Sequence, residues 1–139
     1  MSQAHGFDLE LRCELDEVAR AAAAVRARLC ERGLQERAVY RACLVVEEVL
    51  TNAVRHGGRG PEGRIRLGLE LRPDELVLTF TDDGVPFDPL HAPPFDGNAP
   101  LEERSCGGMG IHLVRQAASA WSYRRVGGSN RLEVRIRVD

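Results

Sequence analysis

The chain has 139 residues, of which 43% are hydrophobic and 29% charged, the composition of one globular domain with its own core. Its formal net charge of −2 leaves no basic footprint, so a direct nucleic-acid partner is not expected. All 19 cationic residues are Arg. Without Lys, the chain has neither a Walker-type phosphate lysine nor a Schiff-base lysine.

The sequence shows no apolar run long enough to cross a membrane and no signal-like N-terminus. We therefore expect a cytoplasmic protein without a membrane partner. The cysteines show neither a CxxC pair nor the spacing of a zinc site, which predicts that they are reduced and fill apolar space. They are Cys13, Cys30, Cys43 and Cys106.

Three elements are predicted in the first part of the chain. Residues 7–13 alternate apolar and polar side chains, as a strand does. Asp16 is a candidate N-cap for an Ala-rich helix that runs to Arg32 and stops at Gly33. A second helix, 35–56, is apolar on nearly all sides, which predicts burial, and the glycine-rich stretch after it ends it.

The middle of the chain predicts a hairpin followed by an irregular segment. Residues 65–71 and 75–82 alternate around an Arg-Pro-Asp turn, which favours two antiparallel strands. Residues 84–108 then contain five prolines and several glycines. A long irregular segment inside a compact domain is usually either functional or disordered.

The last part of the chain predicts one helix and two strands. The helix spans 110–120, and the strands 120–126 and 131–138 flank a turn at 127–130. The order of elements is therefore β-α-α-β-β-loop-α-β-β. It predicts a single domain over residues 1–139, a two-layer α+β sandwich with a mixed, mostly antiparallel sheet and helices on one face.

Polar side chains on the apolar second helix form the first candidate site. Glu48 and Asn52 lie one turn apart, and His56 continues the same row. An Asn oxygen suits Mg²⁺ beside substrate phosphates, and Glu48 is placed to take a proton from a hydroxyl near that cation. In the alternative interpretation, Asn52 caps backbone groups and Glu48 pairs with an Arg.

Two further clusters follow along the chain. Asp82 and Gly84 end a strand, where a carboxylate suits either a plain turn or recognition of an exocyclic amine. Residues 105–110 are glycine-rich and precede a helix, which suits either a phosphate-binding backbone or a hinge. Arg104 could add a charge-assisted contact to phosphate.

Together and in this order, the three clusters resemble the GHKL (Bergerat) ATP-binding fold of histidine kinases, gyrases, ninety-kilodalton-class chaperones and mismatch-repair proteins. Glu48-x-x-x-Asn52 resembles its N box. Asp82-x-Gly84 resembles its first glycine box, in which the Asp meets the adenine amino group. The resemblance spans nearly the whole chain and implies ATP and Mg²⁺ as ligands, with Asn52 as the metal ligand.

The same resemblance makes Gly108-x-Gly110 the second glycine box, beside the phosphates, and residues from about 84 to 108 the ATP lid. It places a hydroxyl near adenine at Ser129. The other residues that it implies at the nucleotide are His56, Arg104, Ser105, Gly107 and Met109.

Within that fold the chain is most similar to the small bacterial anti-sigma-factor serine kinases. The shared features are their short size, the phrase Glu-x-x-x-Asn-Ala-x-x-His and the Glu-Arg-Ser before the second glycine box. The resemblance implies a homodimer that holds a sigma factor and phosphorylates a serine on an anti-anti-sigma (STAS-domain) protein. The chain departs from the pattern at Pro86, at Gly57-Gly58 and in its Pro-rich lid.

Two other functions stay open. One is a nucleotide-dependent binding switch of the same fold that has no kinase activity, although such a switch does not need Glu48 as a base. The other is a detached histidine-kinase catalytic domain. That protein needs a phosphorylatable His on a dimerisation helix, and we find no helical pattern before residue 7.

Overall fold

A computed structural model describes residues 6–57, 60–88 and 113–138. The helices are α1 (Leu15–Glu31) and α2 (Glu36–His56), with a short 3-10 turn, η2 (Gly60–Glu62). The strands are β1 (Gly6–Arg12), β2 (Arg64–Leu71), β3 (Glu75–Asp82), β4 (Ala120–Val126) and β5 (Ser129–Arg137). Residues 113–117 are also helical.

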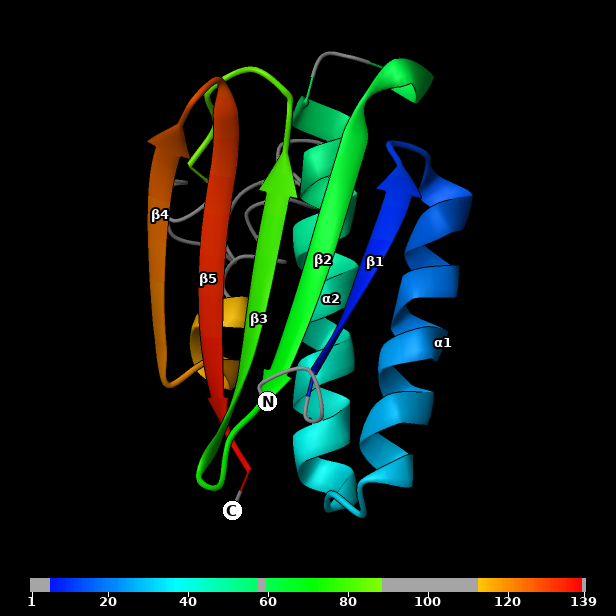
Figure 1. Cartoon of the computed structure of the whole chain (residues 1–139), viewed down its shortest axis with the longest axis vertical. Coiled ribbons are helices and arrows are strands. Elements are labelled where there is room, and N and C mark those ends of the chain that lie inside the picture. The colour runs from blue at the N-terminus through cyan, green and yellow to red at the C-terminus, as the bar shows by residue number, and fades with distance from the viewer. Residues whose placement is uncertain (1–5, 58–59, 89–112, 139) are drawn as a thin grey trace, which may run out of the picture.

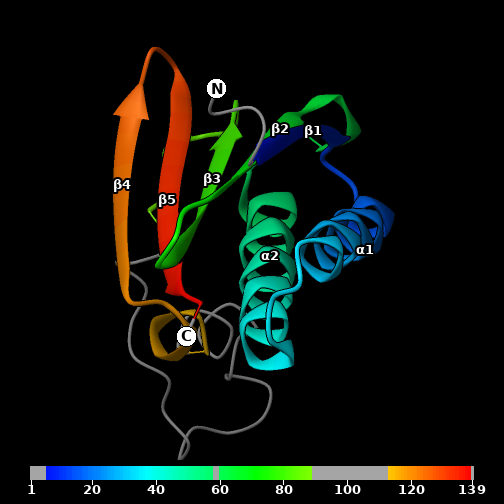
Figure 2. The ribbon, with the colours of Figure 1, turned by 60° about the horizontal axis from the view of Figure 1, so that its bottom comes forward.

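The five strands form one sheet in the order β1-β2-β3-β5-β4, and every neighbouring pair is antiparallel. Figures 1 and 2 show α1 and α2 on the same side of this sheet, with α2 directly behind the strands and α1 beside it. The predicted two-layer α+β sandwich is confirmed. All neighbouring strands in the described part of the chain are antiparallel, so this sheet has no parallel pair.

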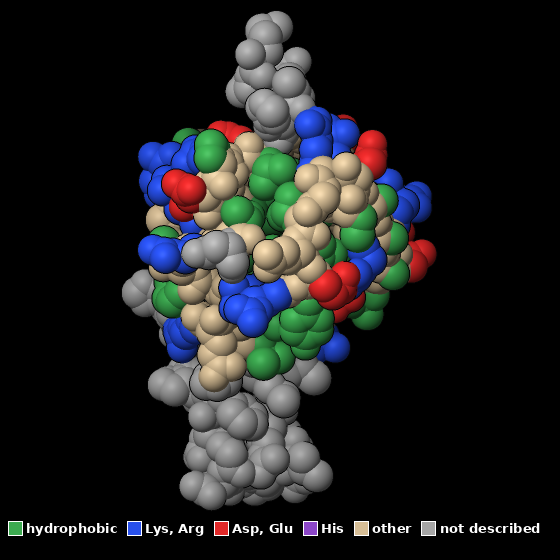
Figure 3. All heavy atoms as spheres, turned by 90° about the horizontal axis from the view of Figure 1, so that it is seen from below, with side chains coloured by type: hydrophobic (Ala, Val, Ile, Leu, Met, Phe, Trp, Pro, Cys, Tyr) green, Lys and Arg blue, Asp and Glu red, His purple; other side chains and the backbone are tan. Residues whose placement is uncertain are grey.

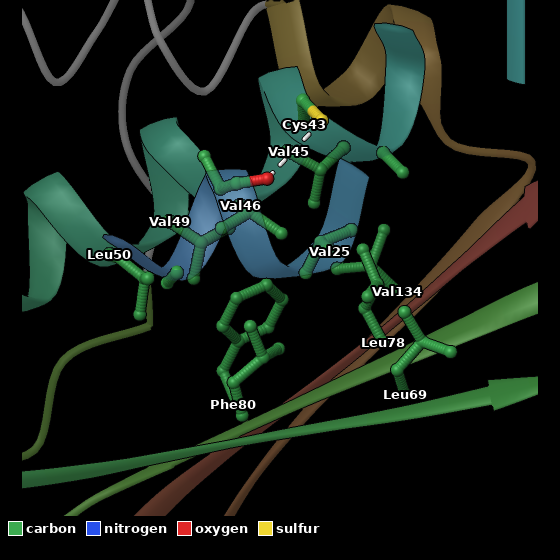
Figure 4. Close-up of a cluster of buried hydrophobic side chains, with 14 of the residues drawn as sticks. Val25, Cys43, Val45, Val46, Val49, Leu50, Leu69, Leu78, Phe80 and Val134 are labelled. Atoms are coloured by element: carbon green, nitrogen blue, oxygen red, sulfur yellow. Dashed lines mark hydrogen bonds between the residues drawn. The ribbon is translucent and has the colours of Figure 1, made fainter. Parts of the chain in front are cut away.

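The core lies between α2 and the inner face of the sheet. Val46 and Leu50 of α2 point toward Leu78 and Phe80 of β3, as Figure 4 shows. On the far side of α2, small residues of α1 allow a close approach, and the Cys43 thiol lies 3.8 Å from the Ala22 carbonyl oxygen. The helix is apolar on two sides because it packs between the sheet and α1.

The predicted cap of the first helix is wrong. The helix begins at Leu15 after the N-cap residue Glu14, which makes no side-chain capping bond. Asp16 lies inside the first turn, where its charge still favours the positive end of the helix dipole. Glu17 accepts a hydrogen bond from the Arg20 side chain and another, at 2.9 Å, from the Arg12 backbone N–H. These two bonds lower the pKa of Glu17 to about 2, and the bond from Arg20 has the larger effect.

Two predicted boundaries near the C-terminus are also wrong. The helix that we extended to Ala120 ends at residue 117, because Ala120 already begins β4. The predicted four-residue turn is shorter. Gly127 and Gly128 have φ values of 55° and 81°, so two residues suffice to reverse the chain, and Ser129 and Asn130 belong to β5.

Within the described ranges, no helix combines the length and the apolar character needed to span a membrane. Figure 3 shows the lower end of the molecule, where side chains of both charges are spread among apolar ones. On that face the positive side chains do not gather into one patch.

Candidate functional site

Glu48, Asn52 and His56 lie on successive turns of α2, as their spacing predicted. Asn52 is only 3% exposed, and its Nδ2 atom is buried without a hydrogen-bond partner among the described residues. A buried amide donor that lacks a partner costs about 1–3 kcal/mol, so native proteins keep few such groups. Asn52 therefore has the chemistry of a residue that contacts a polar ligand.

Glu48 is half-buried, and its environment favours the protonated form. Burial raises the pKa of its carboxyl, and the nearby Glu47 adds to this effect, whereas Arg55 opposes it. A carboxylate with a raised pKa is a stronger base at neutral pH. One turn from Asn52, Glu48 is suited to accept a proton from a hydroxyl group.

Asp82 ends β3 and is held in place from two sides. Its Oδ1 atom accepts hydrogen bonds from the Gly84 backbone N–H at 2.9 Å and from Asn130 Nδ2 at 3.0 Å. The bond from the Gly84 N–H is a local turn contact, which is what the plain-turn interpretation of Asp82 and Gly84 predicted. The second bond ties Asp82 to the neighbouring strand, where Asn130 lies directly opposite it.

Asn130 is a residue of this site that sequence reasoning missed. It is 5% exposed, and its Oδ1 atom accepts hydrogen bonds from the Tyr123 hydroxyl, Arg125 Nη1 at 3.1 Å and the Phe87 backbone N–H at 3.2 Å. Its Nδ2 atom also donates to the Val85 carbonyl at 2.8 Å. The alternation of β5, extended back by two residues from Leu132, could have placed Asn130 on the inner face.

The loop after Asp82 packs on the end of α2. The Val85 backbone N–H donates to the Gly57 carbonyl at 3.0 Å. A Cβ atom at Gly84 would lie 2.8 Å from the Gly57 oxygen and 2.9 Å from its Cα. Only glycine at position 84 allows this approach of two backbone segments.

A cavity of ≈ 30 Å³ lies between α2, the loop and β5. Asn52 and Asp82 both line it, together with Phe87, Tyr123 and Asn130. This volume admits one or two water molecules and is far below the ~300 Å³ at which ligand pockets begin. Phe87 is one of the residues that line it, and the Phe87 ring stacks on His56 with 4.8 Å between ring centroids. A larger ligand therefore requires part of this lining to move.

The structure brings some of the predicted site residues together. Asn52 and Asp82 share the cavity, and Gly84 and His56 adjoin its loop. Ser129 instead lines an open hollow of ≈ 710 Å³ on the helix-free face of the sheet. The other predicted residues lie outside the described part of the chain; they are Arg104, Ser105, Gly107, Gly108, Met109 and Gly110. Most of the segment predicted as a lid lies there too.

Metal-binding side chains are sparse in the described part of the chain. In residues 6–57, 60–88 and 113–138, no group of three or more His, Cys, Asp or Glu could hold a metal ion. A Mg²⁺ ion held by Asn52 would therefore share its coordination with substrate oxygens and water, as this ion commonly does. The unpaired Asn52 Nδ2 atom is a donor, so it fits an oxygen atom of such a ligand, whereas the cation itself would take the Oδ1 atom.

Comparison with known proteins decides the family. The model of the histidine kinase-like ATPase domain matches residues 11–137, nearly the whole chain. The chain belongs to the histidine kinase-like ATPase family. The resemblance to the GHKL fold is confirmed, and the roles that it implies for Asn52 and Asp82 stay predictions.

Relatives of this histidine kinase-like ATPase include named kinases. It is 35% identical over 92 residues to the serine/threonine-protein kinase BtrW of Bordetella bronchiseptica, a match that covers 64% of the chain and 63% of that protein. It is 31% identical over 75 residues to the serine-protein kinase RsbW of Bacillus cereus, covering 51% of the chain and 47% of that protein. The matches thus span about half to two thirds of these relatives.

Solved structures show the same fold. The RsbU and RsbW domains of a Mycobacterium tuberculosis protein match 96% of this chain and 32% of that one, with a TM-score of 0.70 at 15% identity. A blue-light activated histidine kinase of Erythrobacter litoralis matches 76% of this chain and 32% of that one, with a TM-score of 0.54 at 25% identity. The fold is therefore shared with the Mycobacterium tuberculosis RsbU–RsbW protein and with a histidine kinase.

Proposed function

We propose that this protein is an ATP-dependent anti-sigma factor with serine kinase activity, acting in the cytoplasm. It binds a sigma factor and transfers the γ-phosphoryl group of ATP to a serine on an anti-anti-sigma (STAS-domain) protein. One observation carries the proposal. The unpaired, buried amide of Asn52 lies in the same cavity as Asp82, one helical turn from the half-buried Glu48.

Each end of ATP has its own residues in this proposal. The Asp82 carboxylate accepts a hydrogen bond from the exocyclic amine of adenine, since an ionised carboxylate only accepts. Backbone N–H groups of residues 108–110, with Arg104, bind the phosphates. Asn52 holds Mg²⁺, which when bound neutralises charge on the phosphates.

Glu48 carries the chemical step on the protein side. It orients the acceptor serine and takes its hydroxyl proton as the new oxygen–phosphorus bond forms and the bond to the ADP oxygen breaks. Phosphoryl transfer requires little covalent chemistry of the protein, so positioning and charge neutralisation dominate. The raised pKa of Glu48 fits a base that accepts this proton near neutral pH.

The proposed partners are inferred from the similar proteins and not from the geometry of the site. Two relatives are named serine or serine/threonine kinases, and on that likeness we propose a protein serine as the acceptor. The sigma factor, the STAS-domain substrate and the homodimer follow from the resemblance to anti-sigma kinases.

The decisive experiment incubates the purified chain with γ-labelled ATP, Mg²⁺ and candidate STAS-domain proteins. We expect label on a serine of one of them, and a Glu48→Gln variant that binds ATP but transfers at least about a hundredfold more slowly. Glu47→Gln, the exposed neighbour, is the matched control: it removes only the smaller contribution to the raised pKa of Glu48, keeps the base, and should transfer within about threefold of wild type. Transfer by Glu48→Gln at the wild-type rate would remove Glu48 from the catalytic role.

A nucleotide-dependent switch without kinase activity is the second candidate. It is favoured by the loop that carries Phe87, which contacts both the end of α2 and β5 and so could couple nucleotide binding to a partner surface. A pull-down in ADP and in ATP separates the two functions. Capture of a sigma factor that depends on the nucleotide, with no labelled serine on any captured protein, would favour the switch.

A further inference from the structure

A polar row crosses three neighbouring strands at the site. Strand pairing places Arg125 of β4 opposite Asn130 of β5, and Asn130 opposite Asp82 of β3. Further along the same row the partners are apolar, with Ile65 opposite Asp82 and Leu11 opposite Ile65. The row therefore runs from a cation through an amide to a carboxylate, and ends in the core.

The chemistry of the partners fixes the orientation of the Asn130 amide. A guanidinium and a backbone N–H can only donate, so Arg125 and Phe87 both require the Oδ1 atom to face them. The Nδ2 atom then points toward Asp82 Oδ1, 3.0 Å away, and the Val85 carbonyl. A flipped amide would place its oxygen against the Asp82 carboxylate and leave those donors unpaired.

Arg125 also reaches the loop directly. Its Nη1 atom donates to the Gly84 carbonyl at 2.7 Å, while it holds Asn130 Oδ1 at 3.1 Å. The Tyr123 hydroxyl, on the same face of β4, donates to the same Oδ1 atom. Two side chains of the edge strand thus hold both the loop and the amide that contacts Asp82.

We propose that Arg125 and Tyr123 are positioning residues that orient the Asn130 amide, and through it present the Asp82 carboxylate as an acceptor to the exocyclic amine of the base. Neither residue touches the reacting atoms. The inference rests on the proposed nucleotide function and deepens it, because it assigns base selectivity to the edge strand β4.

Base selectivity gives a specific test. ITP carries a carbonyl oxygen where ATP carries the exocyclic amine, so it cannot donate a hydrogen bond to Asp82. A general loss of structure weakens the binding of ATP and ITP alike, whereas a misplaced Asp82 weakens the binding of ATP alone. The ratio of the two affinities therefore separates positioning from folding.

The experiment uses the full chain and measures ATP and ITP affinity, together with hydrogen exchange of the Phe87 amide in the nucleotide-free protein. Arg125→Met removes both donated bonds. Arg124→Met is the control, since this neighbour lies on the opposite face of the exposed edge strand. Arg125→Lys keeps a donor, and Tyr123→Phe is a milder variant that retains the ring if Arg125→Met fails to fold.

We expect Arg125→Met to lower the affinity for ATP about tenfold and to leave the affinity for ITP within about threefold of wild type. The same variant should speed hydrogen exchange of the Phe87 amide. Tyr123→Phe should shift both measurements in the same direction, and Arg125→Lys should recover most of the ATP affinity.

Three outcomes would contradict parts of this inference. An unchanged ratio of ATP to ITP affinity in both Arg125→Met and Tyr123→Phe overturns the positioning role. Unchanged hydrogen exchange of the Phe87 amide in Arg125→Met contradicts the inference that Arg125 fixes the loop in place. Failure of wild type to bind ATP overturns the proposed function, while faster exchange in Arg125→Met, but not in Arg124→Met, still supports the hold of β4 on the loop.

Discussion

Burial raises the pKa of Glu48 above its ordinary value of 4.5, and the neighbouring Glu47 adds to the effect. A raised pKa means that the folded protein holds this proton more tightly than the unfolded chain does. The contribution of Glu48 to stability therefore falls as pH rises from the unfolded pKa through the folded one. At neutral pH the charged Glu48 destabilises the fold.

We accordingly expect Glu48→Gln to melt at a higher temperature than wild type at pH 7, with the difference disappearing below about pH 4, where both states are protonated. Thermal denaturation at several pH values measures this. Glu47→Gln, at an exposed position, removes only the smaller of the two causes and should raise the Tm at pH 7 by less than Glu48→Gln does. A Tm difference for Glu48→Gln that stays constant across this pH range would contradict the assignment of the raised pKa.

The unpaired Asn52 amide makes a second prediction at this scale. Asn52→Leu, which keeps the branched shape although it is larger, removes a buried donor without a partner and should raise the free energy of unfolding by about 1 kcal/mol in a urea titration. The same variant should lose affinity for Mg²⁺-ATP. Thr51→Val, outside the cavity, is the control. Wild-type ATP affinity that does not depend on Mg²⁺ would contradict Asn52 as the metal ligand.

Among the elements, the contact between the loop after β3 and the end of α2 is the tightest at the site. A Cβ atom at Gly84 would meet backbone atoms of Gly57, which cannot turn aside, so Gly84→Ala should cost about 1–3 kcal/mol. Gly68→Ala is the matched control. There the new Cβ meets only the end of the Asp8 side chain at 3.0 Å, which can rotate away. Equal stability losses would contradict this account.

The elements also show what the sequence can and cannot predict. The helix α2 was predicted to within a residue because its apolar pattern is long and ends in glycine. The β4–β5 turn was predicted too long, because Ser129 and Asn130 are common in turns and their place in β5 depends on both glycines adopting positive φ.

The candidate site divides in the same way. Asn52 and Asp82, which line one cavity, could be proposed from the sequence because each belongs to a local motif. Asn130 and Arg125 were missed because their role comes from strand pairing across residues that lie far apart in the chain. No local pattern carries that information, although the family resemblance pointed to a polar residue one position earlier, at Ser129.

At the scale of the whole molecule, a ligand that binds only the folded state stabilises it. With Mg²⁺-ATP at a hundred times its dissociation constant, the gain is about 2.7 kcal/mol, which corresponds to several degrees in Tm for a domain of this size. Asp82→Asn should lose most of this shift, whereas Asp83→Asn next to it should keep it. An ATP-induced shift of equal size in all three proteins would place the base away from Asp82.

The small cavity behind Phe87 has a consequence for the rate of binding. If a base enters only after the Phe87 ring leaves His56, then the apparent affinity equals the intrinsic affinity multiplied by the fraction of open molecules. The observed association rate should then level off at high ATP concentration, at the rate of loop opening. Phe87→Ala should remove that plateau, so this one aromatic stack would set how quickly the protein responds to a change in the ATP supply.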